Sequence, residues 1–305
     1  MQSKRLLTSR AGQEYVCMAF YLHNDRTSDI KKQCQLKRVF SLALLTALLY
    51  TTALAHEYIL LSNSYHVTKG DSLELRLFVG DGFNIMAERP LQQAMTKKFE
   101  LHTPRNTRDL LKGMQGGQLP IYTTKVDFEG QGLFAMERDY ATVTLPNAKF
   151  KSYLAGDNIE GITIDETTKT EQRERYTRYI KTLIQSDPTE SEQLYAKRVG
   201  HTFELILLDD PYQQSAGSWI TAQAYYRGRP LAYKAITARN RMGSEAATYQ
   251  YARTDAEGKC QFKLERGGEW FLHATHMIPA PEGSGVDWES FWTTYTFGVG
   301  DAKSH

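Results

Sequence analysis

The chain has 305 residues, of which 41% are hydrophobic and 24% charged, with 22 glycines and 9 prolines. This ordinary globular composition excludes collagen-like, intrinsically disordered and multi-span membrane proteins. The formal net charge is only +2, and at roughly 150 residues per domain the length predicts about two domains.

The first 55 residues are expected to be a leader that lies outside the fold. Residues 39–55 (VFSLALLTALLYTTALA) carry no charge, follow a basic stretch and end in Ala-Leu-Ala. This pattern is typical of a secretory signal that is cleaved before His56. An uncleaved membrane anchor is the alternative, although the run is short for a span of about 20 residues. Met18 would serve as well as Met1 as the start.

Cleavage before His56 would change both the charge and the cysteine count. The leader holds eight of the 37 basic and three of the 35 acidic residues, so the mature part has a net charge of about −3. No basic field remains to indicate nucleic-acid binding. Only Cys260 remains, which excludes an internal disulfide and argues against a lipoprotein. The expected location is the periplasm of a Gram-negative bacterium, without stable membrane insertion.

Residues 56–165 are expected to form an N-terminal β-sandwich domain. In residues 71–79 (DSLELRLFV), three leucines and a valine alternate with the other residues at the strand period of two, between glycine-containing turns. Further short strands are predicted at 97–102, 121–128, 132–137 and 140–145.

Residues 166–198 are expected to form a helical connector. A capping box starts at Thr168, and apolar residues then recur at the helical offsets 0, 3, 4, 7 and 8 from Tyr176. These features predict an amphipathic helix over 168–185. Arg175 and Arg178 would lie on its solvated face or clamp onto acidic loops.

From 199 to 300 the strand pattern returns as a C-terminal β-sandwich domain, followed by a polar tail at 301–305. Six short strands are predicted at 203–208, 218–226, 232–239, 259–264, 270–277 and 293–299. The turn segments between them resemble those of prealbumin-like and carboxypeptidase-regulatory-like modules. The predicted fold class is therefore mainly β, with two Ig-like or prealbumin-like β-sandwich domains joined by an amphipathic helix.

The sequence carries no local signature of an enzyme. It lacks a G-x-S-x-G elbow, a Walker P-loop, a G-x-G-x-x-G loop after a strand, a CxxC pair and an H-E-x-x-H zinc motif. A protein without covalent chemistry is the favoured interpretation. A hydrolase that uses Asp287 and Glu289 is the least favoured alternative.

The residue that cleavage would expose, His56, is the sharpest candidate for a functional site. Its α-amino group, with a reference pKa of about 7.7–8.0, and its imidazole can together chelate a divalent transition metal. His66, ten residues later, is a further candidate ligand. The alternative is that His56 stands first by chance and that His66 is a surface residue.

A second group of candidates lies near the C-terminus. His273 and His276 are three residues apart in a predicted strand, so they should point to opposite faces, and only one should face a site. The segment 287–292 (DWESFW) would supply a metal carboxylate from Asp287, a sugar-stacking surface, or a polar loop that anchors the last strand by tryptophan burial.

Many segments in one order resemble the NikM-like family of exported bacterial proteins, which is largely of unknown function and is often labelled a nickel or cobalt uptake component. They cover nearly all of 54–297 and include LAHEY (54–58), VGDGF (79–83), ERYTRYIKTL (174–183), GEW (268–270), HM (276–277) and DWES (287–290). The resemblance implies a periplasmic metal-handling protein. His56 and His276, which lie inside matching segments, are the ligands that it favours.

We therefore expect a periplasmic binding or accessory protein that coordinates nickel, cobalt, copper or zinc for uptake or delivery. The candidate ligands are His56, His276, Asp287 and His66. An oxygen ligand would favour nickel, cobalt or zinc, whereas raw affinity favours copper. The expected partner is a membrane transporter or an outer-membrane receptor. The alternative is an envelope module that binds a protein or a glycan, without metal, in the region of Trp288 and Trp292.

Overall fold

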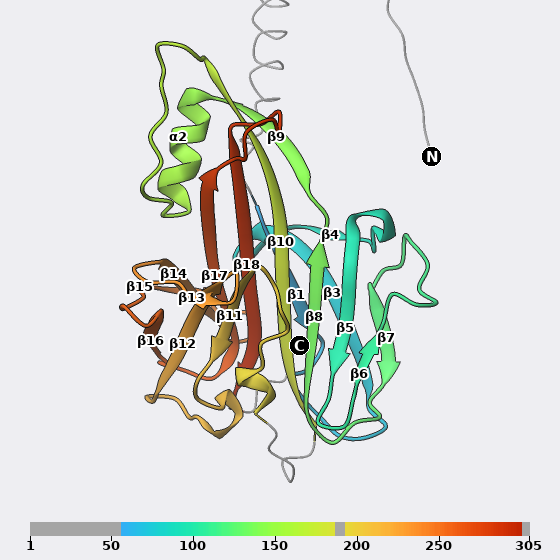
Figure 1. The fold of residues 1–305 in the computed structure, drawn as a ribbon. Helices are drawn as coiled ribbons and strands as arrows, with labels where there is room; N and C mark the ends of the chain where they lie inside the picture. Colours follow the sequence, from blue (N-terminus) through green and yellow to red (C-terminus); the bar gives the residue numbers. More distant parts are fainter. Residues whose placement is uncertain (1–55, 187–192, 301–305) are drawn as a thin grey trace, which may run out of the picture. The chain divides into compact units, whose positions relative to one another are not determined.

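The computed structural model describes residues 56–186 and 193–300, which belong to one compact unit, Leu54–His305 (Figure 1). In these residues the chain forms three β-sheets and one α-helix, α2 (Asn147–Gly156), with short 3-10 helices at Gln93–Met95, Leu194–Ala196 and Pro211–Gln213. The predicted fold class, mainly β with several sheets, is confirmed. No helix in the described ranges has both the length and the hydropathy of a bilayer span.

The largest sheet, the central sheet, draws its ten strands from almost the whole described chain. Their order is β15-β14-β17-β18-β10-β8-β5-β6, and β2 and β9 also pair with β10. The strands are β2 (His66–Val67), β5 (Thr96–His102), β6 (Thr107–Asp109), β8 (Gly130–Arg138), β9 (Ala141–Pro146), β10 (Glu171–Ser186), β14 (Ala235–Arg241), β15 (Thr248–Arg253), β17 (Gly268–Pro279) and β18 (Trp288–Val299). Strands β10 and β18 are parallel, whereas β17 and β18 are antiparallel.

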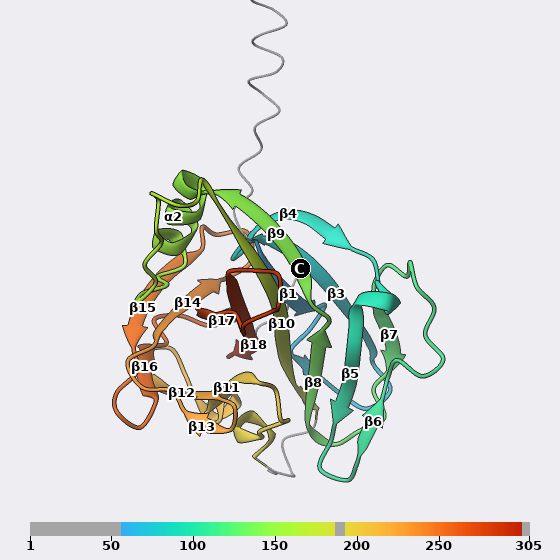
Figure 2. The ribbon, with the colours of Figure 1, turned by 45° about the horizontal axis from the view of Figure 1, so that its top comes forward.

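Two smaller sheets pack on opposite faces of the central sheet. The first sheet contains β1 (Glu57–Ser62), β3 (Ser72–Asp81), β4 (Asn84–Arg89) and β7 (Tyr122–Lys125), and the second contains β11 (Phe203–Leu207), β12 (Trp219–Tyr226), β13 (Arg229–Pro230) and β16 (Lys259–Lys263). On β18, Phe291 and Tyr295 pack in a core with the second sheet, whereas Thr294 and Thr296 bond to β1. Alternation along a strand puts these two sets on opposite faces. Figure 2 shows β12 and β13 on a different side of β10 from β3 and β4.

Apolar burial is divided among several cores. The largest lies between the second sheet and the central sheet, and another lies between the first sheet and strands β5, β8 and β10. A smaller core fixes α2 over β18, where Phe150 stacks on Trp288 at 6.0 Å and Tyr153 on Trp292 at 5.8 Å. The first sheet and α2 therefore share one face of the central sheet.

The helix predicted over 168–185 is wrong, because Glu171–Ser186 is strand β10. The last eight residues of β10 are all buried, since a sheet covers the strand on each face. A strand that is buried on both faces needs no alternation, so apolar residues at helical offsets do not distinguish it from a helix. Its tyrosines, threonines and isoleucines also favour a strand.

The helical connector expected at 166–198 is thus replaced by a strand that both halves of the chain share. Strand β10 pairs with β8 and β9 on the N-terminal side of the sequence and with β18 on the C-terminal side. Lys181 of β10 is buried, forms an ion pair with Glu204 and donates to Leu205 O at 3.1 Å. The sandwich limits 56–165 and 199–300 stay a prediction; the leader 1–55 and the tail 301–305 lie outside the described residues.

Most of the predicted strands are confirmed, with ends that shift by a few residues. They are β3, β5, β7, β8, β9, β11, β12, β14, β16, β17 and β18. Strands β1, β4, β6, β13 and β15 were not predicted, nor was α2, which lies in a region expected to be wholly β. Helix α2 buries Phe150 and Tyr153, which are three residues apart and therefore share one face.

Strand β1 docks onto the central sheet by its free edge. The other edge of β1 pairs with β3. On the free edge, three alternate carbonyls accept from side chains of the central sheet: His56 O from Arg178 (3.2 Å), Tyr58 O from Thr294 (3.1 Å), and Leu60 O from Thr182 and Thr296 (2.7 Å each). A buried carbonyl without a donor costs about 1–3 kcal/mol. These bonds therefore hold the start of β1 against the central sheet.

Replacing Thr182 or Thr296 by valine should lower the free energy of unfolding by about 0.5–1.5 kcal/mol, since Leu60 O keeps one donor in each single variant. The double variant should lose more than the sum, because Leu60 O is then buried without a donor. Urea unfolding measures all three differences. Thr123→Val, at an exposed position of β7, is the control and should change stability by less than about 0.5 kcal/mol. Additive losses would contradict the shared-acceptor interpretation.

Candidate functional site

Six side chains meet where β1 begins, and we call them the amino-end cluster. They come from the start of β1, the end of β3, and from β10, β14 and β17, and they are His56, Glu57, Asp81, Arg178, Arg239 and His273. The cluster lies on the face of the central sheet that carries the first sheet and α2. Tertiary contacts, not sequence neighbourhood, bring these residues together.

Glu57 and His273 form the buried centre of the cluster. They are 4% and 3% exposed, and His273 Nε2 lies 3.7 Å from Glu57 Oε1. Glu57 Oε2 accepts from Gly82 N at 2.6 Å. Burial raises the pKa of Glu57 to about 7 and lowers the pKa of His273 to about 3. At neutral pH the pair is therefore a partly protonated carboxyl beside a neutral imidazole, because low-dielectric surroundings disfavour charge.

His56 and Asp81 lie at the more exposed side of the cluster. Asp81 pairs with Arg239 at 2.6 Å, and Arg239 also lies 3.8 Å from Glu57 Oε1. Burial lowers the pKa of the half-buried His56; the Asp81 charge opposes this shift and the Arg178 charge adds to it. The imidazole of His56 is therefore largely neutral at pH 7, which is the form that binds metals.

Two further buried carboxyls lie beside the cluster. Asp157, at the C-terminal end of α2, has one oxygen, Oδ2, that is buried without a hydrogen-bond partner in the described part of the chain. Burial raises the pKa of Asp157 well above its usual range, and nearby carboxylates raise it further. Glu174 accepts from Tyr153 Oη at 3.0 Å and from Ser290 Oγ, and burial raises the pKa of Glu174 to about 7.

The structure does not bring His56 and His276 together, which corrects the predicted ligand pair. The ring of His276 packs 4.4 Å from that of Tyr226 and 5.9 Å from that of Phe203, both in the second sheet. His56 lies on the other face of the central sheet, with the first sheet. The expectation that His273 and His276 point to opposite faces is confirmed, and it is His273 that faces the cluster.

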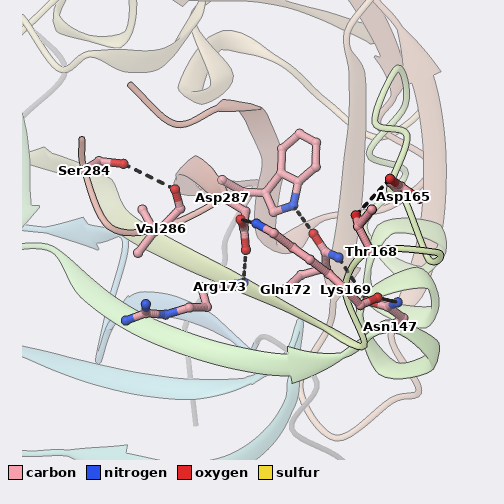
Figure 3. A network of polar contacts seen from close by, with 10 residues as sticks. Asn147, Asp165, Thr168, Lys169, Gln172, Arg173, Ser284, Val286 and Asp287 are labelled. Atoms are coloured by element: carbon pink, nitrogen blue, oxygen red, sulfur yellow. Dashed lines mark hydrogen bonds and ion pairs between the residues drawn. The ribbon is translucent and has the colours of Figure 1, made fainter. Parts of the chain in front are cut away.

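Asp287 anchors a loop and does not join the cluster (Figure 3). Its carboxylate pairs with Lys169 Nζ and accepts from Arg173 N at 2.9 Å. Glu289 is 3% exposed and pairs with Arg175 at 3.1 Å. Each of the two carboxylates thus has a basic partner of its own. The contact of Arg175 with an acidic residue of this segment fits the clamp interpretation.

Trp288 and Trp292 do not form an exposed stacking surface. Trp292 is 2% exposed and donates from its indole nitrogen to Ser290 Oγ at 3.0 Å. Trp288 is half-buried against α2 and donates to Gln172 Oε1 at 2.9 Å. The interpretation that this segment anchors the last strand by tryptophan burial is confirmed.

His66 lies far from the amino-end cluster. It is exposed on β2, where its ring meets the edge of Tyr212 at 4.9 Å. Strand β2 joins β10 at Gln185, seven residues beyond Arg178, or roughly 23 Å along the strand. His66 therefore cannot share an ion with His56.

Side chains alone do not form a ready metal centre. In residues 56–186 and 193–300, no three His, Cys, Asp and Glu side chains are grouped so that they could hold an ion. His56 and Asp81 would need a further donor. The α-amino group that cleavage would create on His56 is one such donor.

The sequence analysis did not identify Glu57, Asp81 and Arg239 as site residues, and it placed Arg178 on a helix. A usable signal was present, because Glu57, Asp81 and Arg178 lie inside three separate segments that carry the family resemblance, 54–58, 79–83 and 174–183. The signal was that each of these segments, far apart in the chain, contains a charged residue, and charged residues of opposite sign can meet in the fold.

A family model described as a domain of unknown function, DUF4198, matches residues 53–278, which include all six residues of the cluster. The chain belongs to the DUF4198 family. No curated protein matches it. Similar solved structures include the D0-D1 domain of intimin, at 10% identity over 79% of this chain and 97% of that one, with a TM-score of 0.19. They also include the D00-D0 domain of intimin, at 11% identity over 80% of this chain and 100% of that one, with a TM-score of 0.20. At these TM-scores the likeness carries no argument about the function of this DUF4198 protein.

The buried carboxyl of Glu174 should make stability depend on pH. Between about pH 4.5 and 7 the unfolded chain has lost this proton and the folded chain keeps it, so the free energy of unfolding falls as pH rises. At 1.36 kcal/mol for each pKa unit, the loss is about 3 kcal/mol. Glu174→Gln keeps an acceptor but has no proton to lose, so its stability relative to wild type should rise by that amount from pH 4.5 to 8.

Urea unfolding at several pH values measures this difference. Glu171→Gln, on the same strand but exposed, is the matched control and should follow the wild type at every pH. A constant difference between Glu174→Gln and wild type would show that Glu174 ionises near its usual range.

Proposed function

We propose that the protein is exported, loses residues 1–55, and binds one divalent transition metal ion at its new amino end for uptake or delivery. The ligands are the α-amino nitrogen and the imidazole of His56 and a carboxylate oxygen of Asp81. This revises the ligand set expected from the sequence, because His66, His276 and Asp287 lie elsewhere with other contacts.

One observation carries the proposal: His56, which cleavage would make the first residue, lies near enough to the carboxylate of Asp81 for the Asp81 charge to act on its imidazole. The resemblance to the NikM-like family adds support. Nitrogen donors suit copper, nickel, cobalt and zinc, and the oxygen donor favours the last three over copper. Three protein donors leave positions for water, or for a ligand from a transporter or receptor that takes over the ion.

Calorimetric titration of the processed protein with Ni²⁺, Co²⁺, Cu²⁺ and Zn²⁺ tests the proposal. His56→Ala, and a two-residue Gly-Ser extension ahead of His56, should each weaken binding by about tenfold or more. Affinity should fall below about pH 8, because the α-amino group takes up a proton there, whereas the imidazole of His56 with its lowered pKa competes only at lower pH.

The controls separate this site from the positions first expected. His66→Ala, His276→Ala and Asp287→Asn should bind metal like the wild type. Mass spectrometry of the exported protein should show His56 as its first residue. Cleavage at another bond, or unchanged binding in His56→Ala, would refute the proposal.

A second candidate function, an envelope module that binds a protein or a glycan, is favoured by a different surface. Tyr233, Tyr249 and Tyr251 are 67%, 54% and 43% exposed at the β15 edge of the central sheet. Arg253 donates to Tyr233 O at 2.8 Å and to Tyr251 Oη at 3.0 Å. Exposed tyrosine and arginine side chains are enriched among residues that dominate binding energy.

Replacing the three tyrosines by serine should abolish binding of the processed protein to immobilised envelope glycans or envelope proteins, because their rings supply the contact area. Surface plasmon resonance measures this loss, and His56→Ala is the control that should retain binding. Equal binding by the triple variant would exclude this surface.

A further inference from the structure

Arg178 has an unusual environment for an arginine in the amino-end cluster. Its guanidinium lies 4.3 Å from the ring centre of Tyr58, 4.6 Å from that of Tyr176 and 5.7 Å from that of Trp292. Its hydrogen-bond acceptor in the described chain is a neutral one, His56 O, and its Nε is buried without a partner. No carboxylate of the described residues pairs with it. Aromatic faces attract a cation but do not neutralise it.

A second arginine on the same aromatic ring is also without a counter-charge. Arg138 is 4% exposed, lies 5.4 Å from the ring centre of Tyr58, and donates to the neutral acceptors Thr96 Oγ1 at 3.0 Å and Gln92 Oε1 at 2.5 Å. Burial lowers the pKa of Arg138, and the Arg178 charge lowers it further. Two cations that repel each other thus flank one tyrosine.

Glu174, an acid whose pKa the Arg178 charge affects, does not balance the charges of the two arginines. The Arg178 charge lowers the pKa of Glu174, but burial outweighs this and keeps the pKa of Glu174 at about 7. Its carboxyl is therefore partly neutral at physiological pH, and Tyr153 and Ser290 already donate to it. A buried cation such as Arg138 is costly without an anion, so an anion bound beside Arg138 and Arg178 would relieve that cost.

Arg178 also has the geometry and the access for such a ligand. The planar guanidinium fork matches a carboxylate or a phosphate with two parallel hydrogen bonds. Arg178, Tyr58 and Tyr176 are each half-buried, so this group keeps part of its surface exposed to solvent, whereas Arg138 is buried and contributes its charge. Arg239 and Arg241, by contrast, each pair with a carboxylate.

We propose that Arg178, held between Tyr58 and Tyr176 and reinforced by the buried charge of Arg138, is a binding site for the carboxylate or phosphoryl group of a small anionic ligand. The site depends on no bound metal and does not use the imidazole of His56. It shares with the proposed function only the cleavage before His56, so a failure of metal binding would not affect it.

Nuclear magnetic resonance titration of the processed, EDTA-treated protein tests the site. Sodium acetate and sodium phosphate are the two probes, added at constant ionic strength with sodium chloride as the balance. The Nε–Hε signal of Arg178 should shift and saturate with one probe or both. Saturation with acetate alone identifies a carboxylate ligand, and saturation with phosphate alone identifies a phosphoryl ligand.

Variants tie the signal to this arginine. Arg178→Gln should weaken binding, read from neighbouring backbone amides, by at least about tenfold, the loss expected for a charge-assisted hydrogen bond. Arg178→Lys keeps the charge without the fork and should bind with intermediate affinity, which also covers the case in which the glutamine variant does not fold. Arg173→Gln, exposed on the same strand, should bind like the wild type. No saturable shift with either probe, or wild-type affinity in both Arg178 variants, would overturn the proposal.

Discussion

The free edge of β1 is the contact on which the candidate site depends. Carbonyls of His56, Tyr58 and Leu60 point away from the first sheet and would be buried without donors if the central sheet did not supply them. Arginine and threonine side chains of β10 and β18 supply them in register. A strand edge that would otherwise be unsatisfied is thereby converted into an attachment, and the amino end is held against β10, β14 and β17.

Strand β10 makes this attachment possible because it belongs to both halves of the chain. Its even-numbered residues face the first sheet and its odd-numbered ones face the second, so each core uses one side of the same strand. The buried pair of Lys181 and Glu204 ties it to β11. Removal of one partner of a buried pair leaves an uncompensated charge, which costs about 3–5 kcal/mol, so this pair is a strong constraint on how the halves meet.

The amino-end cluster brings acidic and basic side chains together at a partly buried place, whereas most ion pairs of the described chain lie at the surface. Glu57, His56 and His273 in it shift toward their neutral forms because burial disfavours charge. Arginine cannot make this adjustment, since its pKa is too high. That asymmetry explains why the two proposals, a cation held by His56 and Asp81 and an anion held by Arg178, concern neighbouring residues and yet rest on different physics.

The sequence by itself determined those features that local patterns encode. The alternation in residues 71–79 predicted β3, the turn signals located most other strands, and the three-residue spacing placed His273 and His276 on opposite faces. It did not determine that Glu171–Ser186 is a strand, because burial on both faces removes the period that tells a strand from a helix. The family resemblance favoured His276 as the neighbour of the amino end, whereas that neighbour is His273. Tryptophan burial was one of three interpretations of residues 287–292, and the fold buries Trp292. Only the tertiary structure decided these, because each depends on which sheet covers which face, and that is set by strands distant in the chain.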